Sequence, residues 1–291
     1  MQKAIGFIGL GIMGFSMAGH LATKGHKVSV FNRSLKKSQE WIKKHNGTLC
    51  ESLSELAESA EVIILCVGND DDVKNIINGD DGIINYLKPG TILIDHTTTS
   101  AELPIELNES LNLKKVSFLD APVSGGQAGA ESGILSVMVG GNKESYKDIK
   151  EIIGTYSKFI KYMGESGSGQ LTKMVNQICI AGLIQALAEG INFSDEVGLN
   201  TKDVIEVISK GAAQSWQMEN RWKTMINDEY DHGFAVDLMR KDLDIVLKKA
   251  KTNNIPIDIT KIVNDYYKDI QKAGGGRLDT SSLLKRIKDL I

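Results

Sequence analysis

The chain has 291 residues, a formal net charge of −3 and an isoelectric point near 6.0. Hydrophobic residues make up 42% of it and charged residues 24%, which is typical of a packed globular protein and excludes a disordered chain. The length suits one large domain or two ordinary ones. A slightly acidic chain has no general attraction to nucleic acid or to an anionic membrane, so any bound anion must be held by a local group.

Cysteine usage and the N-terminus indicate a cytoplasmic protein. Cys50, Cys66 and Cys179 lie too far apart for a metal site or a disulfide framework, and we expect Cys66 and Cys179 to be buried, reduced thiols within apolar runs. The first residues enter a strand pattern directly, without the features of a signal peptide. Polar residues interrupt the apolar segment 171–191, which predicts a buried helix and not a membrane span.

The first half of the chain alternates short apolar runs with helical patterns. Strands are predicted at 4–8, 28–31, 62–67, 92–94, 117–119 and 136–139, with amphipathic helices at 34–44 and 52–59 between them. Alternation of this kind predicts an α/β fold, a mostly parallel, doubly wound sheet of the Rossmann type with right-handed crossovers.

The pattern changes after Tyr162. Residues 164–169 form a Gly/Ser-rich connector, and only helices are predicted beyond it, at 170–197, 204–210, 217–227, 238–251, 259–271 and 282–290. The first would be about 40 Å long at a rise of 1.5 Å per residue, long enough to join two domains. We therefore predict a Rossmann domain at 1–163 and an all-helical substrate or dimerisation domain at 164–291.

A glycine-rich turn follows the first strand and opens a helix that extends to about Lys24. The turn reads Gly9, Leu10, Gly11, Ile12, Met13, Gly14. Glycine permits so tight a turn and lets a pyrophosphate approach main-chain N–H groups at a helix N-terminus. This position between strand and helix, with a second strand at the right distance, predicts a dinucleotide site.

The second predicted strand ends in Asn32, Arg33 and Ser34. An NAD site usually has a carboxylate here that binds the ribose 2′-hydroxyl. A carboxylate would repel a 2′-phosphate, whereas a guanidinium binds it through paired charge-assisted hydrogen bonds. We therefore expect NADP in preference to NAD.

Three later turns follow predicted strands and are expected to line the cofactor and the substrate, since ligands of such sheets bind beyond the carboxyl ends of the strands. Val67 and Gly68 form the first, and Thr98 lies in the second. The third contains Ser124, Gly125 and Gly126, whose hydroxyl and unhindered N–H groups suit a substrate carboxylate.

Lys173 is the candidate for proton transfer. It lies early in the long helix among apolar neighbours, where desolvation would lower its pKa toward neutrality. Asn176 and Gln177 lie three and four residues further on, on the same helix face, where either amide can reach the same bound oxygen.

Four motifs in order resemble those of the β-hydroxyacid dehydrogenase family, over essentially the whole chain. They are the turn 9–14, the segment 120–126, the run 167–177 and the triplet 241–243. The family includes 3-hydroxyisobutyrate dehydrogenases, tartronate semialdehyde reductases and glyoxylate/succinic semialdehyde reductases, and the Asn32-Arg33 pair looks most like the last, NADP-using branch. The resemblance implies that Lys173 protonates the carbonyl oxygen and that residues 124–126 hold the substrate carboxylate. It also implies that Thr98 and Lys241 contact the cofactor, with Asp242 nearby. The family often has asparagine one turn after the lysine, where this chain has Gln177.

The sequence leaves several alternatives open. A 6-phosphogluconate-type enzyme would have a much larger helical domain, an imine reductase would lack Lys173, and a non-catalytic dinucleotide-binding module would not need Lys173 and Ser124 together. His96, beside Asp95, suggests a histidine-based dehydrogenase, but without a supporting motif we interpret it as a loop or cofactor-rim residue. A small carboxylate is the expected substrate, selected by side chains such as Trp216, Phe234 and Met239. The long apolar helix suggests a homo-oligomer, a dimer or tetramer, although burial within its own domain explains it equally well.

Overall fold

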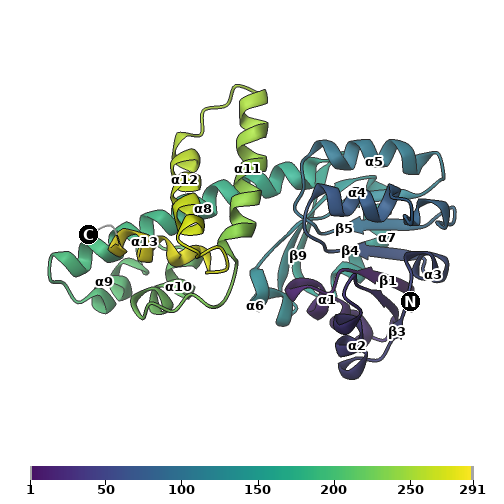
Figure 1. The fold of residues 1–291 in the computed structure, drawn as a ribbon, viewed down its shortest axis with the longest axis horizontal. Coiled ribbons are helices and arrows are strands. Elements are labelled where there is room, and N and C mark those ends of the chain that lie inside the picture. Colours follow the sequence, from purple (N-terminus) through teal and green to yellow (C-terminus); the bar gives the residue numbers. More distant parts are fainter. Residues whose placement is uncertain (1, 290–291) are drawn as a thin grey trace. The chain divides into compact units, whose positions relative to one another are not determined.

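The computed structural model describes residues 2–289, and the chain divides into two units, residues 1–173 and residues 174–291. The first unit alternates strands and helices as the sequence predicts (Figure 1). In chain order its elements are β1 Ala4–Ile8, α1 Ile12–Thr23, β2 Lys27–Phe31, α2 Leu35–Lys44, β3 Thr48–Leu49, α3 Leu53–Ser59, β4 Val62–Leu65, α4 Asp70–Asn78, η1 Ile83–Asn85, β5 Ile92–Asp95, α5 Glu102–Asn112, β6 Ser117–Asp120, β7 Val123–Ser124, α6 Gly126–Glu131, β8 Leu135–Gly141, α7 Lys143–Ile153 and β9 Ser157–Gly164.

These strands form a single, mostly parallel sheet, which confirms the predicted fold class. The strand order is β3-β2-β1-β4-β5-β6-β8-β7, with β9 pairing to β8. Strands β1 to β6 pair in parallel, β8 runs antiparallel to β6 and β7, and β9 is parallel to β8. The chain steps from β1 to β2 on one side and returns to β4 on the other, so the topological switch point lies between β1 and β4.

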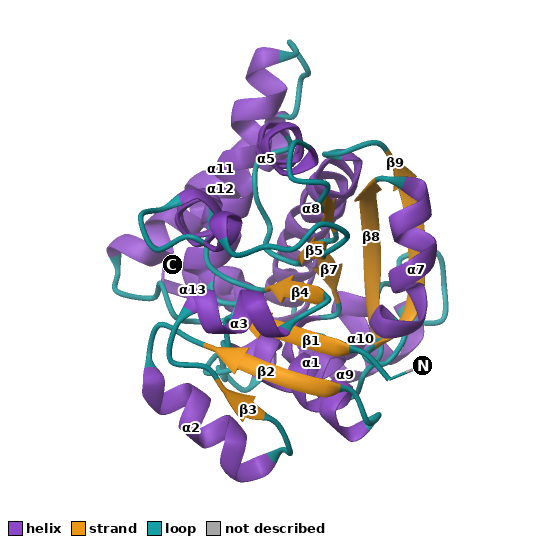
Figure 2. Ribbon diagram, turned by 90° about the vertical axis from the view of Figure 1, so that its right-hand side faces the viewer, coloured by secondary structure: helices purple, strands orange, loops and turns teal. Residues whose placement is uncertain are grey.

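Three strands were not predicted. β3 and β7 have two residues each, too few for a hydrophobic period. β9 lies beside β8 (Figure 2), and its sequence puts Lys158 and Lys161 between apolar residues. Phe159 is 59% exposed, so β9 is a half-solvated strand without the continuous apolar run that marks the central strands.

Helices cover both faces of the sheet. One apolar cluster packs Met17 and Leu21 of α1, Trp41 of α2 and Ile149 of α7 against the strands. The other cluster, on the opposite face, takes its helical residues from α3, α4 and α5. Figure 1 shows α4 and α5 on one side of the strands and α1 and α2 on the other. Burial on both faces explains why β4 reads as an uninterrupted Val-Ile-Ile-Leu run.

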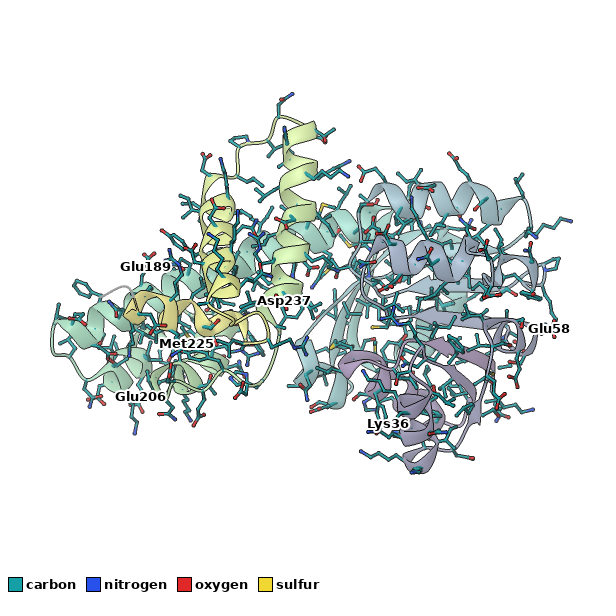
Figure 3. All side chains as sticks on the ribbon, in the orientation of Figure 1. Lys36, Glu58, Glu189, Glu206, Met225 and Asp237 are labelled. Atoms are coloured by element: carbon teal, nitrogen blue, oxygen red, sulfur yellow. The ribbon has the colours of Figure 1, made fainter. Side chains whose placement is uncertain are left out.

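The second unit is helical in all its described elements. Helix α8, Ser168–Glu196, carries the chain into it, and α9 Thr201–Ile208, α10 Trp216–Ile226, α11 Val236–Thr252, α12 Asp258–Lys272, η2 Thr280–Ser282 and α13 Leu283–Asp289 follow. Each predicted helix is present with ends shifted by up to three residues; Leu290, the predicted end of the last helix, lies outside the described residues. Met225 and Tyr267 belong to the core, whereas Glu206 projects at the surface (Figure 3).

Helix α8 is long and apolar enough to span a membrane by length and composition. Its Ala181, Ile184 and Ile191 side chains lie in the core of the helical unit, so it is a core helix, as the sequence predicts. The prediction of a buried helix holds for one face only, because Val175 is 59% exposed and Phe193 66%. Cys179 lies on the exposed part, which corrects its expected burial.

Candidate active site

The carboxyl ends of the parallel strands bring the predicted cofactor residues of the first unit to one edge of the sheet. The turn after β1 bonds to the end of β2 through Gly9 N–H and the Phe31 carbonyl, 3.0 Å apart. The end of β4 bonds to the loop after β5, where Val67 N–H donates to Thr97 Oγ1 over 3.0 Å. This edge includes the switch point between β1 and β4, where doubly wound sheets bind their ligands.

The glycine-rich turn has the geometry that its sequence predicts. Gly9 has a φ of 96°, and a Cβ there would lie 2.3 Å from the Cys66 carbonyl oxygen. Gly14 lies in α1, and its Cβ would be 1.9 Å from the Gly9 carbonyl oxygen. A Cβ on Gly11 would meet nothing within 4 Å. Gly9 and Gly14 are therefore required by the protein's own packing, and Gly11 leaves open space in front of the helix N-terminus. Leu10 precedes this position, and Ile12 and Met13 begin α1.

Asn32 and Arg33 take different roles at the end of β2. The Asn32 side chain accepts a hydrogen bond from Leu10 N–H at 2.8 Å and donates one to the Ser34 carbonyl at 3.1 Å. Asn32 thus holds the glycine-rich turn, a role that sequence reasoning missed. The Arg33 side chain is 93% exposed and its guanidinium lies 3.7 Å from the Asp72 carboxylate. Ser34 is the N-cap residue of α2.

Gln170 ties the loop after β5 to the first turn of α8. Its side-chain carbonyl accepts from Thr99 N–H at 3.1 Å, and its amide donates to the Thr97 carbonyl at 2.8 Å. Thr98 lies between these two contacts and is partly buried. Gly68, in the neighbouring turn, is exposed, and a Cβ there would meet the Asp72 carboxylate at 2.5 Å.

The segment after β6 begins with a buried carboxylate. Asp120 is fully buried and accepts hydrogen bonds from Gly167 N–H at 2.8 Å and Gln170 N–H at 2.9 Å. Burial raises the pKa of Asp120 to about 6. Ser124 follows in β7, and Gly125 and Gly126 have φ of 138° and 59°, values that favour glycine. The segment predicted to hold the substrate carboxylate is therefore a turn in which any residue other than glycine at 125 or 126 would strain the backbone.

Lys173 lies on α8 and is 7% exposed. Further along this helix, the Asn176 side-chain amide donates to the side-chain carbonyl oxygen of Gln177 over 2.8 Å. The side-chain amide nitrogen of Gln177 donates to the Asp242 carboxylate over 2.7 Å. Asp242 also pairs with Lys241 Nζ at 3.1 Å. Both polar atoms of the Gln177 side chain therefore have partners within the protein, and Gln177 is 1% exposed whereas Asn176 is only partly buried.

The three side chains that the sequence suggested for substrate selection have different environments. Met239 is fully buried and its sulfur lies 3.6 Å from the Gln177 amide nitrogen. Trp216 is 48% exposed, with the Arg221 guanidinium 5.1 Å from its ring centroid. Phe234 is partly buried and its N–H donates to Asp279 at 2.8 Å. Burial makes Met239 a core residue.

His96 lies in the loop directly after β5, as the sequence predicts, but its side chain is buried in the core, which corrects the expectation of a rim position. It is 3% exposed; its Nδ1 lies 2.5 Å from the Ala121 carbonyl oxygen and its Nε2 lies 2.8 Å from the Tyr156 hydroxyl. The neutral ring satisfies both contacts if Nδ1–H donates to the carbonyl and Nε2 accepts from the hydroxyl. Burial lowers the pKa of His96 to about 4.

This burial predicts a pH dependence of stability. The unfolded chain takes up a proton at His96 near the ordinary pKa of 6.5, whereas the folded chain does so only near 4. His96 therefore contributes stability that is fully present above pH 6.5 and is lost as the pH falls to 4, by about 3 kcal/mol. Asp120, with its raised pKa, acts in the opposite direction over a similar range, so wild type must be compared with His96→Gln.

Urea unfolding of both proteins at steps from pH 7.5 to 4 provides the measurement, because the Asp120 contribution is common to the two and cancels. The stability advantage of wild type over His96→Gln should shrink by about 3 kcal/mol. A constant difference across the range would show that the folded histidine titrates normally.

Comparison with known proteins identifies both halves of the chain. Residues 4–164 match the NAD-binding domain of 6-phosphogluconate dehydrogenase, and residues 167–287 match a domain described as the NAD-binding part of NADP-dependent 3-hydroxyisobutyrate dehydrogenase. An uncharacterised oxidoreductase of Shewanella frigidimarina is 49% identical over 98% of both chains. The 2-(hydroxymethyl)glutarate dehydrogenase of Eubacterium barkeri is 30% identical over 98% of this chain and 95% of its own.

Among solved structures, the 3-hydroxyisobutyrate dehydrogenase of Mycobacterium tuberculosis, determined with L-serine, superposes with a TM-score of 0.89 at 25% identity and covers 99% of both chains. Family matches over nearly the whole chain, the full-length relatives and this shared fold agree on one family. The chain is a member of the β-hydroxyacid dehydrogenase family, an NAD(P)-dependent oxidoreductase that acts on a CH–OH group.

Proposed function

We propose that the enzyme is NADP-dependent and interconverts a small aldehyde- or keto-acid and its hydroxy acid, as glyoxylate/succinic semialdehyde reductases and 3-hydroxyisobutyrate dehydrogenases do. The observation that carries this proposal is the attachment of the first turn of α8 to the edge of the sheet. Asp120 and Gln170 fasten that turn to the ends of β6 and β5, the edge at which the glycine-rich turn also lies. Lys173, a buried amine, follows one turn later.

The residues at this edge fit a dinucleotide. The open space in front of Gly11 would take a pyrophosphate, close to main-chain N–H groups of the helix N-terminus. The exposed Arg33 guanidinium suits a 2′-phosphate. Val67, Gly68 and Thr98 would line the rest of the cofactor, and Lys241 is a proposed cofactor contact by resemblance to the family.

When bound, the nicotinamide supplies or accepts the hydride at the substrate carbon. Lys173 Nζ would donate a proton to the carbonyl oxygen during reduction and take it back during oxidation. Ser124 and the N–H groups of Gly125 and Gly126 would hold the substrate carboxylate. We assign the substrate contact to Asn176, since the polar atoms of Gln177 already bond to Asn176 and Asp242, and Gln177 would orient it.

We also propose that the functional domains divide near 163/164, where β9 ends at Gly164 and the connector to α8 at Ser168 begins. The compact units divide later, at 173/174, because the first turn of α8 is bonded to the sheet through Asp120 and Gln170. A cytoplasmic homo-oligomer, a dimer or tetramer, is the form that we expect. Light scattering coupled to size-exclusion chromatography measures its mass directly.

An activity screen tests the proposed reaction. Small aldehyde- and keto-acids and cyclic imines are offered with NADPH, and hydroxy acids with NADP⁺, with the esters of the acids as controls. The acids should turn over and the esters, which lack the negative charge, should be poor substrates. Equal turnover of esters and acids would contradict the proposed carboxylate contacts of residues 124–126, and turnover of cyclic imines alone would point to an imine reductase.

Replacing Arg33 by alanine should weaken NADPH binding by about tenfold or more and leave NADH binding unchanged, because a hydrogen bond to a charged group contributes about 1.5–3 kcal/mol. The 3.7 Å pair with Asp72 is solvent-exposed on the arginine side and is too weak to hold the guanidinium away from a phosphate. Titration of both cofactors by nicotinamide fluorescence is the measurement. Lys36→Ala removes an exposed charge on the adjoining helix (Figure 3) and is the matched control. Wild-type NADPH affinity in Arg33→Ala would contradict the assignment.

A further inference from the structure

Two residues without an assigned role connect the lysine helix to the sheet. Asp120 ends β6, and its two carboxylate oxygens accept from Gly167 N–H and Gln170 N–H, at the start of α8. The first N–H groups of a helix have no partner within the helix. A carboxylate that accepts two of them fixes both the position and the rotation of the first turn.

The space around this carboxylate admits little movement. A Cβ on Gly140 would lie 2.6 Å from one Asp120 carboxylate oxygen, and a Cβ on Gly169 would lie 2.8 Å from the other. The same Cβ on Gly169 would lie 2.5 Å from the Met138 carbonyl oxygen. Glycines at 140 and 169 thus allow α8 to start in direct contact with the backbone of β6 and β8, with Asp120 enclosed between them.

Gln170 extends the connection to the next strand. Its backbone N–H is bonded to Asp120, and its side chain bonds in both directions to the loop after β5, at Thr97 and Thr99. Thr97 in turn accepts from Val67 N–H at the end of β4. Hydrogen bonds therefore link the end of β4 to the loop after β5, and that loop and the end of β6 to the first turn of α8, which precedes Lys173. Every residue that takes part in these bonds is buried or partly buried.

We propose that Asp120 and Gln170 are positioning residues that fix the first turn of α8, and with it the amine of Lys173, relative to the cofactor edge of the sheet. The proposal rests on the proposed role of Lys173. Proton transfer requires the donor within hydrogen-bond distance of the reacting oxygen, and a misplacement of about 1 Å costs about 10²-fold in rate. The glycine-rich turn is held by the end of β2 and by Asn32, so we expect NADPH affinity to depend much less than kcat on where α8 begins.

The test compares Asp120→Asn, Gln170→Glu and Lys173→Ala with Ser145→Ala. Asparagine keeps the shape of Asp120 but turns an NH₂ donor toward a backbone N–H. Glutamate at 170 keeps the acceptor for Thr99 N–H and loses the donor to the Thr97 carbonyl. Ser145 is the control, because it is a buried residue that bonds to Ser117 at the other end of β6, 2.9 Å away.

Both positioning variants should lower kcat by about 10- to 100-fold, keep the NADPH dissociation constant within about threefold, and enlarge the solvent deuterium isotope effect on kcat. Ser145→Ala should match wild type in all three. Normal kcat and a normal isotope effect in Gln170→Glu, or equal losses of kcat and NADPH binding in the variants, would overturn the proposal. If Asp120→Asn does not fold, Gln170→Glu decides alone. An active Lys173→Ala would instead refute the proposed function, so the two failures are distinguishable.

Discussion

Replacing Lys173 by alanine is expected to lower kcat by at least about 10²-fold and to leave NADPH binding intact, since positioned acid–base groups contribute about 10²- to 10⁴-fold. The lysine is 7% exposed and lies one turn beyond the contacts of Gln170. Its removal deletes the proton donor without touching the glycine-rich turn. Lys173→Arg should be nearly as poor, because a guanidinium keeps the charge but does not release a proton near neutral pH and has a different, planar shape.

Steady-state kinetics and a fluorescence titration of NADPH measure the two effects separately. Lys161→Ala removes an exposed lysine from β9 of the same unit and should behave as wild type. Added methylamine should partly restore Lys173→Ala, because a small primary amine can enter the space and donate the proton. Near-normal activity of Lys173→Ala without amine would refute the role, and loss of NADPH binding together with kcat would make the lysine a structural residue.

The fold is predictable where the sequence has a run or regular spacing of apolar residues, or glycines at a tight turn. The central parallel strands are buried on both faces, so they read as apolar runs, and glycines mark the turn after β1. β9 is not predictable from an apolar run because Lys158 and Lys161 interrupt its apolar residues. The start of α8 was placed two residues late, at 170, because Ser168 and Gly169 resemble a linker in sequence. The N–H groups of Gly167 and Gln170 at the start of this helix find their hydrogen-bond acceptor in Asp120, at the end of β6.

The roles of polar side chains were less predictable, since they depend on residues far away in the chain. Asn32 lies 22 positions from Leu10, and Asp120 lies 47 and 50 positions from Gly167 and Gln170. No local pattern marks such pairs. The sequence places His96 in a loop or at the cofactor rim; it does lie in the loop after β5, but its bond to Tyr156, 60 positions on, buries it in the core. Asp120 is the exception, because a carboxylate at the end of an apolar strand indicates a buried hydrogen-bond acceptor.

Substitutions at Gly11 and Gly14 should separate the cofactor's space from the protein's own packing. Gly11 has an ordinary φ of −69° and a Cβ there meets nothing within 4 Å, so Gly11→Val should fold with a wild-type melting temperature. Its side chain would fill the space proposed for the pyrophosphate. Because each charge-assisted hydrogen bond contributes about 1.5–3 kcal/mol, NADPH binding should weaken by about 100-fold or more.

Gly14→Ala, unlike Gly11→Val, should destabilise the protein itself. Its Cβ would lie 1.9 Å from the Gly9 carbonyl oxygen, which is backbone and cannot rotate aside. Alanine gains up to about 1 kcal/mol over glycine within a helix, but overpacking of this kind typically costs about 1–3 kcal/mol, and a backbone collision lies at the upper end. We expect a lower melting temperature in the absence of cofactor, with weakened NADPH binding as a consequence. Thermal unfolding without cofactor and a fluorescence titration at 10 °C distinguish the two variants. Normal NADPH affinity in a folded Gly11→Val protein would show that the space in front of α1 is not where the pyrophosphate binds.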